Sequence, residues 1–292
     1  MRVFVTGSGG HIGSAVVAEL IEAGHEVVGL VRSEASADAV AALGAEPLRG
    51  DVNDVALLRT TAEAVDAVSH LAFDNVAAAT GGVGAAADAD RLVVRAFADA
   101  LEGSDKAFIG IGMGRTGDEE LDRRLEQNPR TFVSREVAEF AARGIRSILI
   151  AIPPVTHSDR DTHGFVPMLI DIARRTGVSG YIDEGQNLWP AVHTLDLAHL
   201  YRLALENAPA GAQLIGAAEP GIPVRDIAES IARHLGVPAA SIPADTAAEH
   251  FAPFPFMGMD VTMPNEQTRA LLDWDPTHLT LLEEIDSGHY FA

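Results

Sequence analysis

A glycine-rich segment near the start of the chain constrains its fold more than any other feature. Residues 6–13, TGSGGHIG, follow an apolar run at Arg2–Thr6 and precede a helical pattern at Ile12–Ala23. A strand, a glycine-rich turn and a helix in this order begin a βαβ unit, and βαβ units build parallel sheets. The segment therefore predicts an α/β fold.

The same alternation of apolar runs and helical patterns continues through the first 150 residues. We expect strands at Arg2–Thr6, His25–Val31, Glu46–Leu48, Ala67–Phe73, Ala107–Ile111 and Arg146–Ile152. We expect helices at Ile12–Ala23, Ala37–Leu43 with Ser36 as its N-cap, Asp54–Ala64, Ala85–Leu101 and Phe132–Ala142. On the long helix, Leu92, Val93 and Phe97 should share one face. With right-handed crossovers, these elements predict a doubly wound parallel Rossmann sheet.

Beyond Pro154 the alternation becomes irregular, and helical patterns stand out only at Leu195–Glu206 and Val224–Leu235. We expect residues 1–155 to form the Rossmann domain. Residues 156–292 should mostly form a smaller C-terminal substrate lobe, with residues 190–215 returning to the Rossmann sheet.

Composition excludes several classes of function. The 292 residues carry a formal net charge of −21 and contain no cysteine. Disulfides and thiolate metal sites are therefore excluded. The acidic balance argues against a nucleic-acid partner or an anionic membrane surface. Since no run approaches the roughly 18 apolar residues of a membrane span, we expect a cytoplasmic protein with a small-molecule substrate.

The glycine-rich segment has the spacing of a dinucleotide-binding turn. Gly7 permits the tight turn, Gly10 lets the backbone approach a pyrophosphate, and Gly13 lets the helix pack closely on the strand. His11 and Ile12 contribute the backbone of the first helical turn, whose N–H groups attract an anion. We therefore expect these five residues to bind a dinucleotide cofactor.

The end of the second strand indicates which dinucleotide is bound. A carboxylate there favours NAD, whereas arginine accommodates the 2′-phosphate of NADP. The chain has Arg32 and Ser33 at this point, and its first acidic residue is Glu34. The pattern favours NADP; NAD remains the alternative if Arg32 is only a solvated surface residue.

Several motifs resemble the short-chain dehydrogenase/reductase superfamily, in its extended or atypical branch. They are TGSGGHIG at 6–13, GDV at 50–52, HLAF at 70–73, PPVTH at 153–157, HTLDLA at 193–198 and LLDWDP at 271–276. The resemblance implies that Asp51 and Val52 lie at the adenine, although Asp51 would equally suit a helix cap. It implies that Leu71, Ala72 and Phe73 lie along the cofactor, and that the segment ending at His157 approaches the nicotinamide.

The catalytic pair of the superfamily is absent from this chain. The family pattern is YxxxK, but none of the three tyrosines lies four residues before the single lysine, Lys106. The matching segment, TFVSREVAE at 131–139, has Thr131 in the tyrosine position and Arg135 in the lysine position. Arg135 can hold the ribose and supply charge, or simply pair with Glu139 on the surface.

The proton donor must then come from elsewhere, because arginine stays charged at neutral pH and the threonine hydroxyl is a weak acid. Water and a histidine of the second lobe, His157 or His163, are the candidates. The loop that holds these two histidines superficially offers metal ligands. The superfamily uses no metal, and we expect none here.

The segment HFAPFPFMGM at 250–259 is rich in aromatic residues and methionine, inside a stretch without lysine or arginine. We expect His250, Phe254, Phe256 and Met257 to form an apolar lid over the substrate. The alternative is that they form the core of their own lobe.

These features together predict an NADP(H)-dependent oxidoreductase that acts on a small, rather apolar carbonyl or alcohol with a non-standard acid/base group. A catalytically silent NAD(P)-binding sensor is the alternative from another class. A nucleotide-sugar epimerase or dehydratase is the third hypothesis, weakened by the missing dyad and the lack of basic residues. By analogy we expect a homodimer through Ala85–Leu101 and Phe132–Ala142.

Overall fold

The computed structural model describes residues 1–74, 81–113, 123 and 126–292. The chain forms two compact units. Unit 1 comprises residues 1–152, 197–216 and 266–274, and unit 2 comprises residues 153–196, 217–265 and 275–292.

Unit 1 is built on a parallel sheet. Its strands are β1 (Arg2–Thr6), β2 (Glu26–Val31), β3 (Glu46–Arg49), β4 (Ala67–His70), β5 (Ala107–Gly112), β6 (Arg146–Ala151) and β10 (Ala212–Ile215). Their order is β10-β6-β5-β4-β1-β2-β3, and each neighbouring pair is parallel. This order confirms the doubly wound Rossmann sheet. Six of its strands come from the first 151 residues, and the seventh, β10, comes from residues 212–215.

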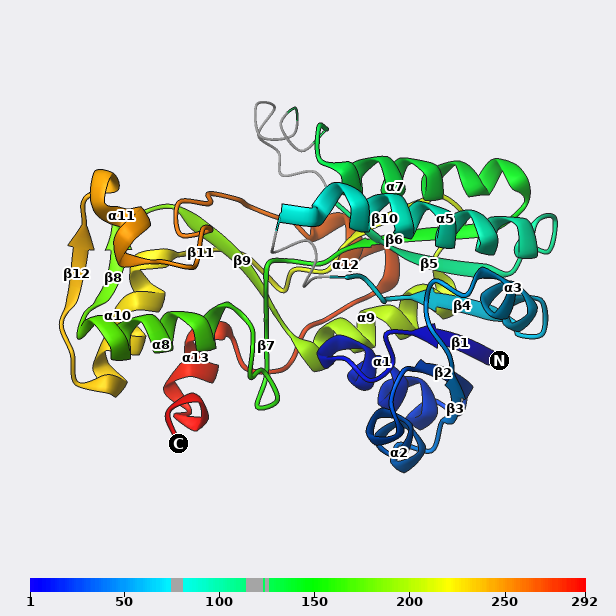
Figure 1. Ribbon diagram of the computed structural model, residues 1–292, viewed down its shortest axis with the longest axis horizontal. Coiled ribbons are helices and arrows are strands. Elements are labelled where there is room, and N and C mark those ends of the chain that lie inside the picture. Colours follow the sequence, from blue (N-terminus) through cyan, green and yellow to red (C-terminus); the bar gives the residue numbers. More distant parts are fainter. Residues whose placement is uncertain (75–80, 114–122, 124–125) are drawn as a thin grey trace. The chain divides into compact units, whose positions relative to one another are not determined.

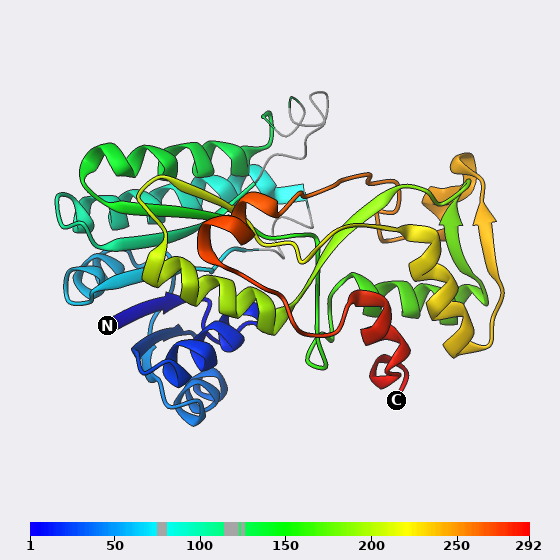
Figure 2. The ribbon, with the colours of Figure 1, turned by 180° about the vertical axis from the view of Figure 1, so that it is seen from behind.

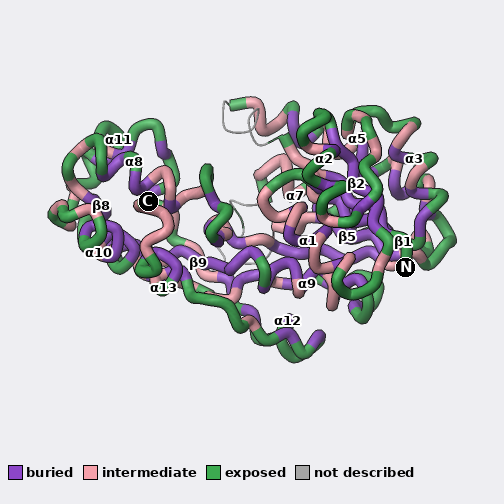
Figure 3. Tube along the Cα trace, turned by 90° about the horizontal axis from the view of Figure 1, so that it is seen from below, coloured by how far each residue is buried: buried purple, intermediate pink, exposed green. Residues whose placement is uncertain are grey.

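Helices cover both faces of this sheet. They are α1 (His11–Glu22), α2 (Glu34–Ala42), α3 (Val55–Glu63), α5 (Val83–Leu101), α7 (Pro129–Ala138) with the 3-10 turn η2 (Glu139–Arg143), α9 (Thr194–Asn207) and α12 (Glu266–Leu272). Figure 1 shows α3, α5 and α7 on one face, and their apolar residues share one core with the strands. Figure 2 shows α9 in yellow-green and α12 in orange-red on the opposite face. Apart from the edge strand β3, whose residues are mostly exposed, the strands between these layers are largely buried (Figure 3).

Helices α2 and α5 are among those that differ from the sequence-based expectation. The first is α2, which begins three residues earlier than predicted, because the Ser33 side chain, and not that of Ser36, caps it by accepting the Ser36 N–H at 3.1 Å. The second is α5, on which Leu92 is 63% exposed, whereas Val93, Val94 and Phe97 are buried. Leu92 therefore lies on the outer face of this helix, where the predicted dimer contact would need an apolar side chain.

The strand β4 is shorter than predicted and ends at His70. The reason is that the Thr6 side chain, and not a neighbouring strand, accepts the next backbone hydrogen bonds. The N–H groups of Leu71 and Ala72 both donate to Thr6 Oγ1, each at 3.1 Å, instead of to a neighbouring strand. The segment after His70 is thus fixed to the end of β1.

Unit 2 has its own core and two small sheets. Its strands are β7 (Val155–His157), β8 (Ser179–Ile182), β9 (Leu188–His193), β11 (Glu219–Pro223) and β12 (Ala239–Ile242). Its helices are α8 (Phe165–Thr176), α10 (Val224–Leu235), α11 (Ala244–His250), α13 (Leu281–Asp286) and the 3-10 turn η3 (His289–Phe291). One sheet has the order β11-β9-β7, and β12 pairs with β8. Trp189, Phe251 and Leu281 lie in the shared core.

Over the part of the chain that the structure describes, none of the helices combines the length and apolar character needed to cross a bilayer.

Candidate functional site

The glycine-rich turn after β1 forms a close-packed cradle. Gly7 has a φ of +69°, and a Cβ there would lie 2.9 Å from the Ala72 nitrogen. At Gly13 a Cβ would lie only 2.0 Å from the Gly7 carbonyl oxygen. The Gly10 N–H donates to that same carbonyl at 2.9 Å and closes the turn. Glycine is therefore required at Gly7 by conformation and at Gly13 by contact.

The cradle opens onto the N-terminus of α1. The helix begins at His11 with Gly10 as its N-cap, so no side chain caps it. Oriented N–H groups of a first helical turn, approached through glycines, are the donors that a pyrophosphate uses. Ile12 in this turn is half-buried. The residues present thus fit the phosphates of a dinucleotide.

Two hydroxyl groups hold the cradle to the rest of the sheet. Ser8 Oγ donates to the Leu30 carbonyl at 2.9 Å and ties the turn to β2. Thr6 Oγ1 holds the backbone of Leu71 and Ala72 against the other side of the turn. The segment that follows β4 therefore lies beside the glycine turn at Leu71 and Ala72, and the next residue, Phe73, is half-buried.

Arg32 lies at the carboxyl end of β2 and is exposed. Within the described ranges it forms no ion pair with a carboxylate, and the nearest acidic residue in the sequence, Glu34, is bound to Arg49 at 2.6 Å. Ser33 Oγ accepts the Ser36 N–H and lies 2.8 Å from Ser36 Oγ, so its first role is to cap α2. Arg32 is the residue here that remains available for an anion.

Asp51 and Val52 follow β3. The Asp51 carboxylate accepts the Asn53 N–H at 2.8 Å and closes a local turn. The N-cap of α3 is Asp54, which accepts the Leu57 N–H at 3.1 Å. Val52 packs half-buried against the core of unit 1. Asp51 is therefore not the cap of α3. Its carboxylate is exposed, and its contact with the adenine stays a prediction.

Helix α7 carries the two residues aligned with the family dyad. It begins at Pro129, capped by Asn128, three residues before the predicted start. Thr131 is half-buried and Arg135 is exposed. Arg135 pairs with Glu126 at 3.4 Å, so the surface pair predicted with Glu139 is wrong in its partner. The helix wheel turns Arg135 toward solvent because Val133, Ser134 and Val137 face the sheet.

A different arginine of α7 lies inside unit 1. Arg130 is half-buried, and its guanidinium lies 4.2 Å from the centre of the Phe73 ring. It lines a small cavity together with His70, at the end of β4, and Asp90, on α5. His70 Nε2 lies 2.8 Å from the Asp90 carboxylate, and His70 Nδ1 lies 2.7 Å from Thr6 Oγ1. The sequence did not suggest this group, although Pro129 as a first helical residue would have placed Arg130, Ser134 and Val137 on one inward face.

In unit 2 the predicted lid residues lie in two environments. Phe254 and Met257 are 3% and 2% exposed and belong to the core, which supports the alternative reading for them. Phe256 is 46% exposed and stacks on Phe165 with a centroid distance of 5.5 Å. His250 is half-buried against Phe251. Phe256 is therefore the lid residue that offers apolar surface, anchored by its buried neighbours.

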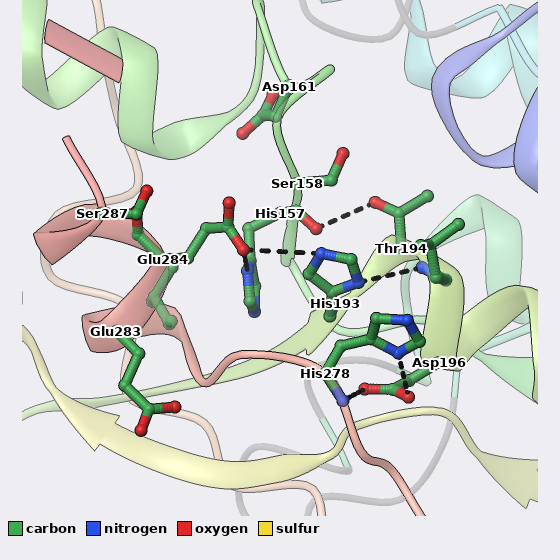
Figure 4. Close-up of polar contacts among 12 residues, drawn as sticks. His157, Ser158, Asp161, His193, Thr194, Asp196, His278, Glu283, Glu284 and Ser287 are labelled. Atoms are coloured by element: carbon green, nitrogen blue, oxygen red, sulfur yellow. Dashed lines mark hydrogen bonds and ion pairs between the residues drawn. The ribbon is translucent and has the colours of Figure 1, made fainter. Parts of the chain in front are cut away.

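His157, a predicted catalytic histidine, belongs to a buried cluster of unit 2 (Figure 4). The His157 side chain is fully buried, with its ring nitrogens 3.9 Å from the carboxylates of Glu219 and Glu284. His193 Nε2 lies 3.4 Å from Glu284, and its Nδ1 accepts the Leu195 N–H at 3.2 Å. His157 thus contacts the carboxylates of its own unit, and a direct contact with a substrate would need this cluster to open.

Comparison with known proteins gives consistent relationships. Residues 7–143 match a family model described as NAD(P)H-binding. An uncharacterised protein of Schizosaccharomyces pombe is 38% identical over the full length of both chains. The UDP-glucose 4-epimerase of Thermotoga maritima has the same fold, with a TM-score of 0.76 at 17% identity over 100% of this chain and 98% of its own. The chain belongs to the extended short-chain dehydrogenase/reductase superfamily.

One further relative is named for its activity. A 4-hydroxy-2-methyl-3-oxo-4-farnesyl-3,4-dihydroquinoline-1-oxide ketoreductase of Stigmatella aurantiaca is 30% identical over 72% of this chain and 66% of its own. The chain therefore belongs to an NAD(P)-binding family whose relatives include a ketoreductase and an epimerase.

A second group in unit 2 resembles a metal site but is arranged differently. Ligand atoms of His193, Asp196 and His278 lie within 4.8 Å of one another. The His193 and His278 rings, however, are stacked with an interplanar angle of 5° and a centroid distance of 4.7 Å. Imidazole lone pairs lie in the ring plane, so two stacked rings cannot both point at one ion. As arranged, this group forms hydrogen bonds, with His278 Nδ1 2.7 Å from Asp196.

The Glu284 carboxylate makes unit 2 sensitive to pH. Burial raises the pKa of Glu284 and the Asp159 carboxylate acts in the same direction, while His289 and His278 oppose this effect. The native state therefore retains this proton to a higher pH than the unfolded chain does. The stability that this proton provides is present below the ordinary pKa and is lost as the pH rises through the native pKa.

Glu284→Gln should therefore gain free energy of unfolding relative to wild type as the pH rises from the ordinary pKa of a glutamate through the raised native pKa of Glu284. Urea denaturation at several pH values measures this difference. Glu283→Gln is the matched control: the Thr280 backbone N–H lowers the pKa of Glu283, so the difference should move in the opposite direction. A Glu284→Gln difference that is constant with pH would contradict this assignment.

Proposed function

We propose that this protein is an NADP(H)-dependent oxidoreductase that reduces a small, largely apolar carbonyl compound or oxidises the corresponding alcohol. The observation that carries the cofactor assignment is Arg32, an exposed cation at the end of β2 without an ion pair among the described residues. An arginine in this place suits the dianionic 2′-phosphate, whereas NAD-binding sheets carry a carboxylate there.

The residues of unit 1 have distinct parts in this proposal. Gly7, Gly10 and Gly13 admit the pyrophosphate to the N-terminus of α1, and Arg32 holds the 2′-phosphate. Arg135 would hold the nicotinamide ribose after leaving its exposed pair with Glu126. When bound, the cofactor supplies the hydride chemistry, and the protein supplies orientation and electrostatics.

Two observations support an apolar carbonyl as the substrate. The Stigmatella aurantiaca ketoreductase that resembles this chain acts, by its name, on a compound with a farnesyl group. In unit 2, Phe256 presents an exposed aromatic face stacked on Phe165. Nucleotide-sugar enzymes need cations for a diphosphate, and residues 234–268 of this chain contain no lysine or arginine.

Arg32→Ala tests the cofactor assignment. Because a charge-assisted phosphate contact contributes about 2 kcal/mol, we expect the Kd for NADPH to rise about 30-fold while the Kd for NADH stays unchanged. Isothermal titration with both cofactors measures this. Arg59→Ala removes an exposed arginine paired with Glu63 and serves as the control. An unchanged preference in Arg32→Ala would refute the assignment.

A further inference from the structure

A small cavity at the carboxyl ends of β4 and β5 is lined by charged side chains, those of Arg130 and Asp90. Its lining combines the polar side chains of Arg130, His70 and Asp90 with apolar residues that include Val94, Ile111 and Val133. Its volume of about 20 Å³ holds one water-sized group. The cavity lies at the edge of a parallel sheet where α/β proteins bind their ligands.

The hydrogen bonds of this group have a fixed direction. Thr6 Oγ1 already accepts the N–H groups of Leu71 and Ala72, so its own proton goes to His70 Nδ1 at 2.7 Å. With Nδ1 as an acceptor, neutral His70 carries its proton on Nε2 and donates it to Asp90 at 2.8 Å. His70 therefore holds the Asp90 carboxylate in place and has no proton to offer the cavity.

Arg130 is the group whose donors remain for a ligand. Burial lowers the pKa of Arg130, and the Asp90 charge acts against this effect. Because the ordinary pKa of arginine lies far above neutral pH, the guanidinium is a cation in a partly desolvated place. Phe73 supports one face of its plane at 4.2 Å. Among the residues that the structure describes, no carboxylate lies within ion-pair distance of it. A planar cation held this way can donate to an oxygen atom in the cavity.

We propose that Arg130 binds and polarises the carbonyl oxygen of the substrate. It would do so in place of the tyrosine of the YxxxK pattern, which the chain lacks. This inference rests on the proposed function and names a catalytic residue for it. A bound reduced dinucleotide would supply the hydride for the carbonyl carbon and would itself be oxidised. The π electron pair of the carbonyl then moves to oxygen, and the Arg130 guanidinium stabilises the alkoxide that forms. The alkoxide then takes a proton from water and leaves hydroxide for the solvent. Arg130 therefore needs no proton of its own to give.

The size of the cavity also defines the substrate. A space for one water-sized group admits a single carbonyl oxygen, and its apolar walls include Val94, Ile111 and Val133. A ketone or aldehyde with apolar substituents fits this description. A sugar ring, which brings several hydroxyl groups to the same place, does not.

Three variants at two residues, Arg130 and Arg135, test the proposal. We expect Arg130→Gln to lower kcat/KM by about 100- to 1000-fold, as the loss of an oxyanion donor does, while the Kd for NADPH changes less than threefold. Arg130→Lys should recover about a tenth of wild-type kcat/KM, because it restores charge without the planar fork. Arg135→Gln should instead raise the Kd for NADPH. If Arg135→Gln lowers kcat/KM as Arg130→Gln does, with NADPH binding unchanged, Arg135 is the catalytic cation and the proposal fails.

A second measurement does not depend on turnover. Formate is a small planar anion that an available arginine binds, and ¹⁵N NMR reports on each guanidinium Nε. At constant ionic strength, formate should shift the Arg130 signal to saturation in the wild-type protein and leave the Arg59 signal unmoved. Failure of this shift overturns the proposal. A saturable shift in a protein that reduces no carbonyl would instead refute the proposed function and leave Arg130 as an oxygen-binding residue.

Discussion

Gly13→Ala is expected to abolish NADPH binding, with at least a 100-fold rise in Kd. The added methyl group would lie 2.0 Å from the Gly7 carbonyl oxygen and 2.7 Å from the Gly7 carbonyl carbon. Both are backbone atoms of the turn, so they cannot move without opening the cradle. We also expect a loss of about 3 kcal/mol in the free energy of unfolding, the cost of an overpacked contact. Isothermal titration and urea denaturation measure the two effects.

Gly84→Ala is the control for this prediction. Gly84 lies in α5, where a Cβ would meet no atom within 4 Å. Alanine there should leave NADPH binding unchanged and raise the free energy of unfolding by up to about 1 kcal/mol, since helical glycine is unfavourable. Wild-type affinity for NADPH in Gly13→Ala would show that the close contact in the turn is not needed for binding.

Asp196→Ala should lose about 3 kcal/mol in the free energy of unfolding. The buried Asp196 carboxylate accepts the N–H groups of Thr277 at 3.0 Å and His278 at 3.2 Å, together with His278 Nδ1 at 2.7 Å. Alanine leaves these donors without an acceptor, and several lost bonds to a charged group cost this much. Urea denaturation measures the loss.

The matched variant is Asp196→Asn, which keeps one acceptor oxygen in the same shape. It should lose less than half as much free energy of unfolding as Asp196→Ala does. Equal losses in the two variants would mean that packing, and not hydrogen bonding by the carboxylate, holds the segment at Thr277 and His278.

The fold was predictable because its signals are local. The glycine spacing at Gly7 and Gly13, and the alternation of strands and helices after it, depend on neighbouring residues along the chain. Helix α10 (Val224–Leu235) was predicted with its actual bounds, since apolar residues recur on one face and Gly236 ends it in the left-handed conformation. The bounds of short elements were predicted less accurately: α2 was expected to start at Ala37 with Ser36 as its N-cap, whereas Ser33 caps it.

The candidate site was less predictable because its contacts are distant in sequence. Thr6, His70 and Asp90 form one hydrogen-bonded chain across 84 positions of sequence. Nothing in the local pattern of any of the three residues indicates the others. Arg130 was missed for a different reason: with the helix start placed at Phe132, its inward-facing position was not visible. The burial of Phe254 and Met257 likewise follows from packing that composition cannot reveal.

The activity proposed for this protein is hydride transfer between NADP(H) and a carbonyl carbon. The most direct test is a single-turnover reaction with NADPH deuterated on nicotinamide C4, in both stereochemical forms, and a series of aliphatic and aromatic ketones. With one of the two forms, deuterium is expected on the carbinol carbon of a product, detected by mass spectrometry, and this label should be lost in Arg130→Gln. Tight NADPH binding with no deuterium in any product would contradict the proposed activity and would identify the protein as a cofactor-binding sensor.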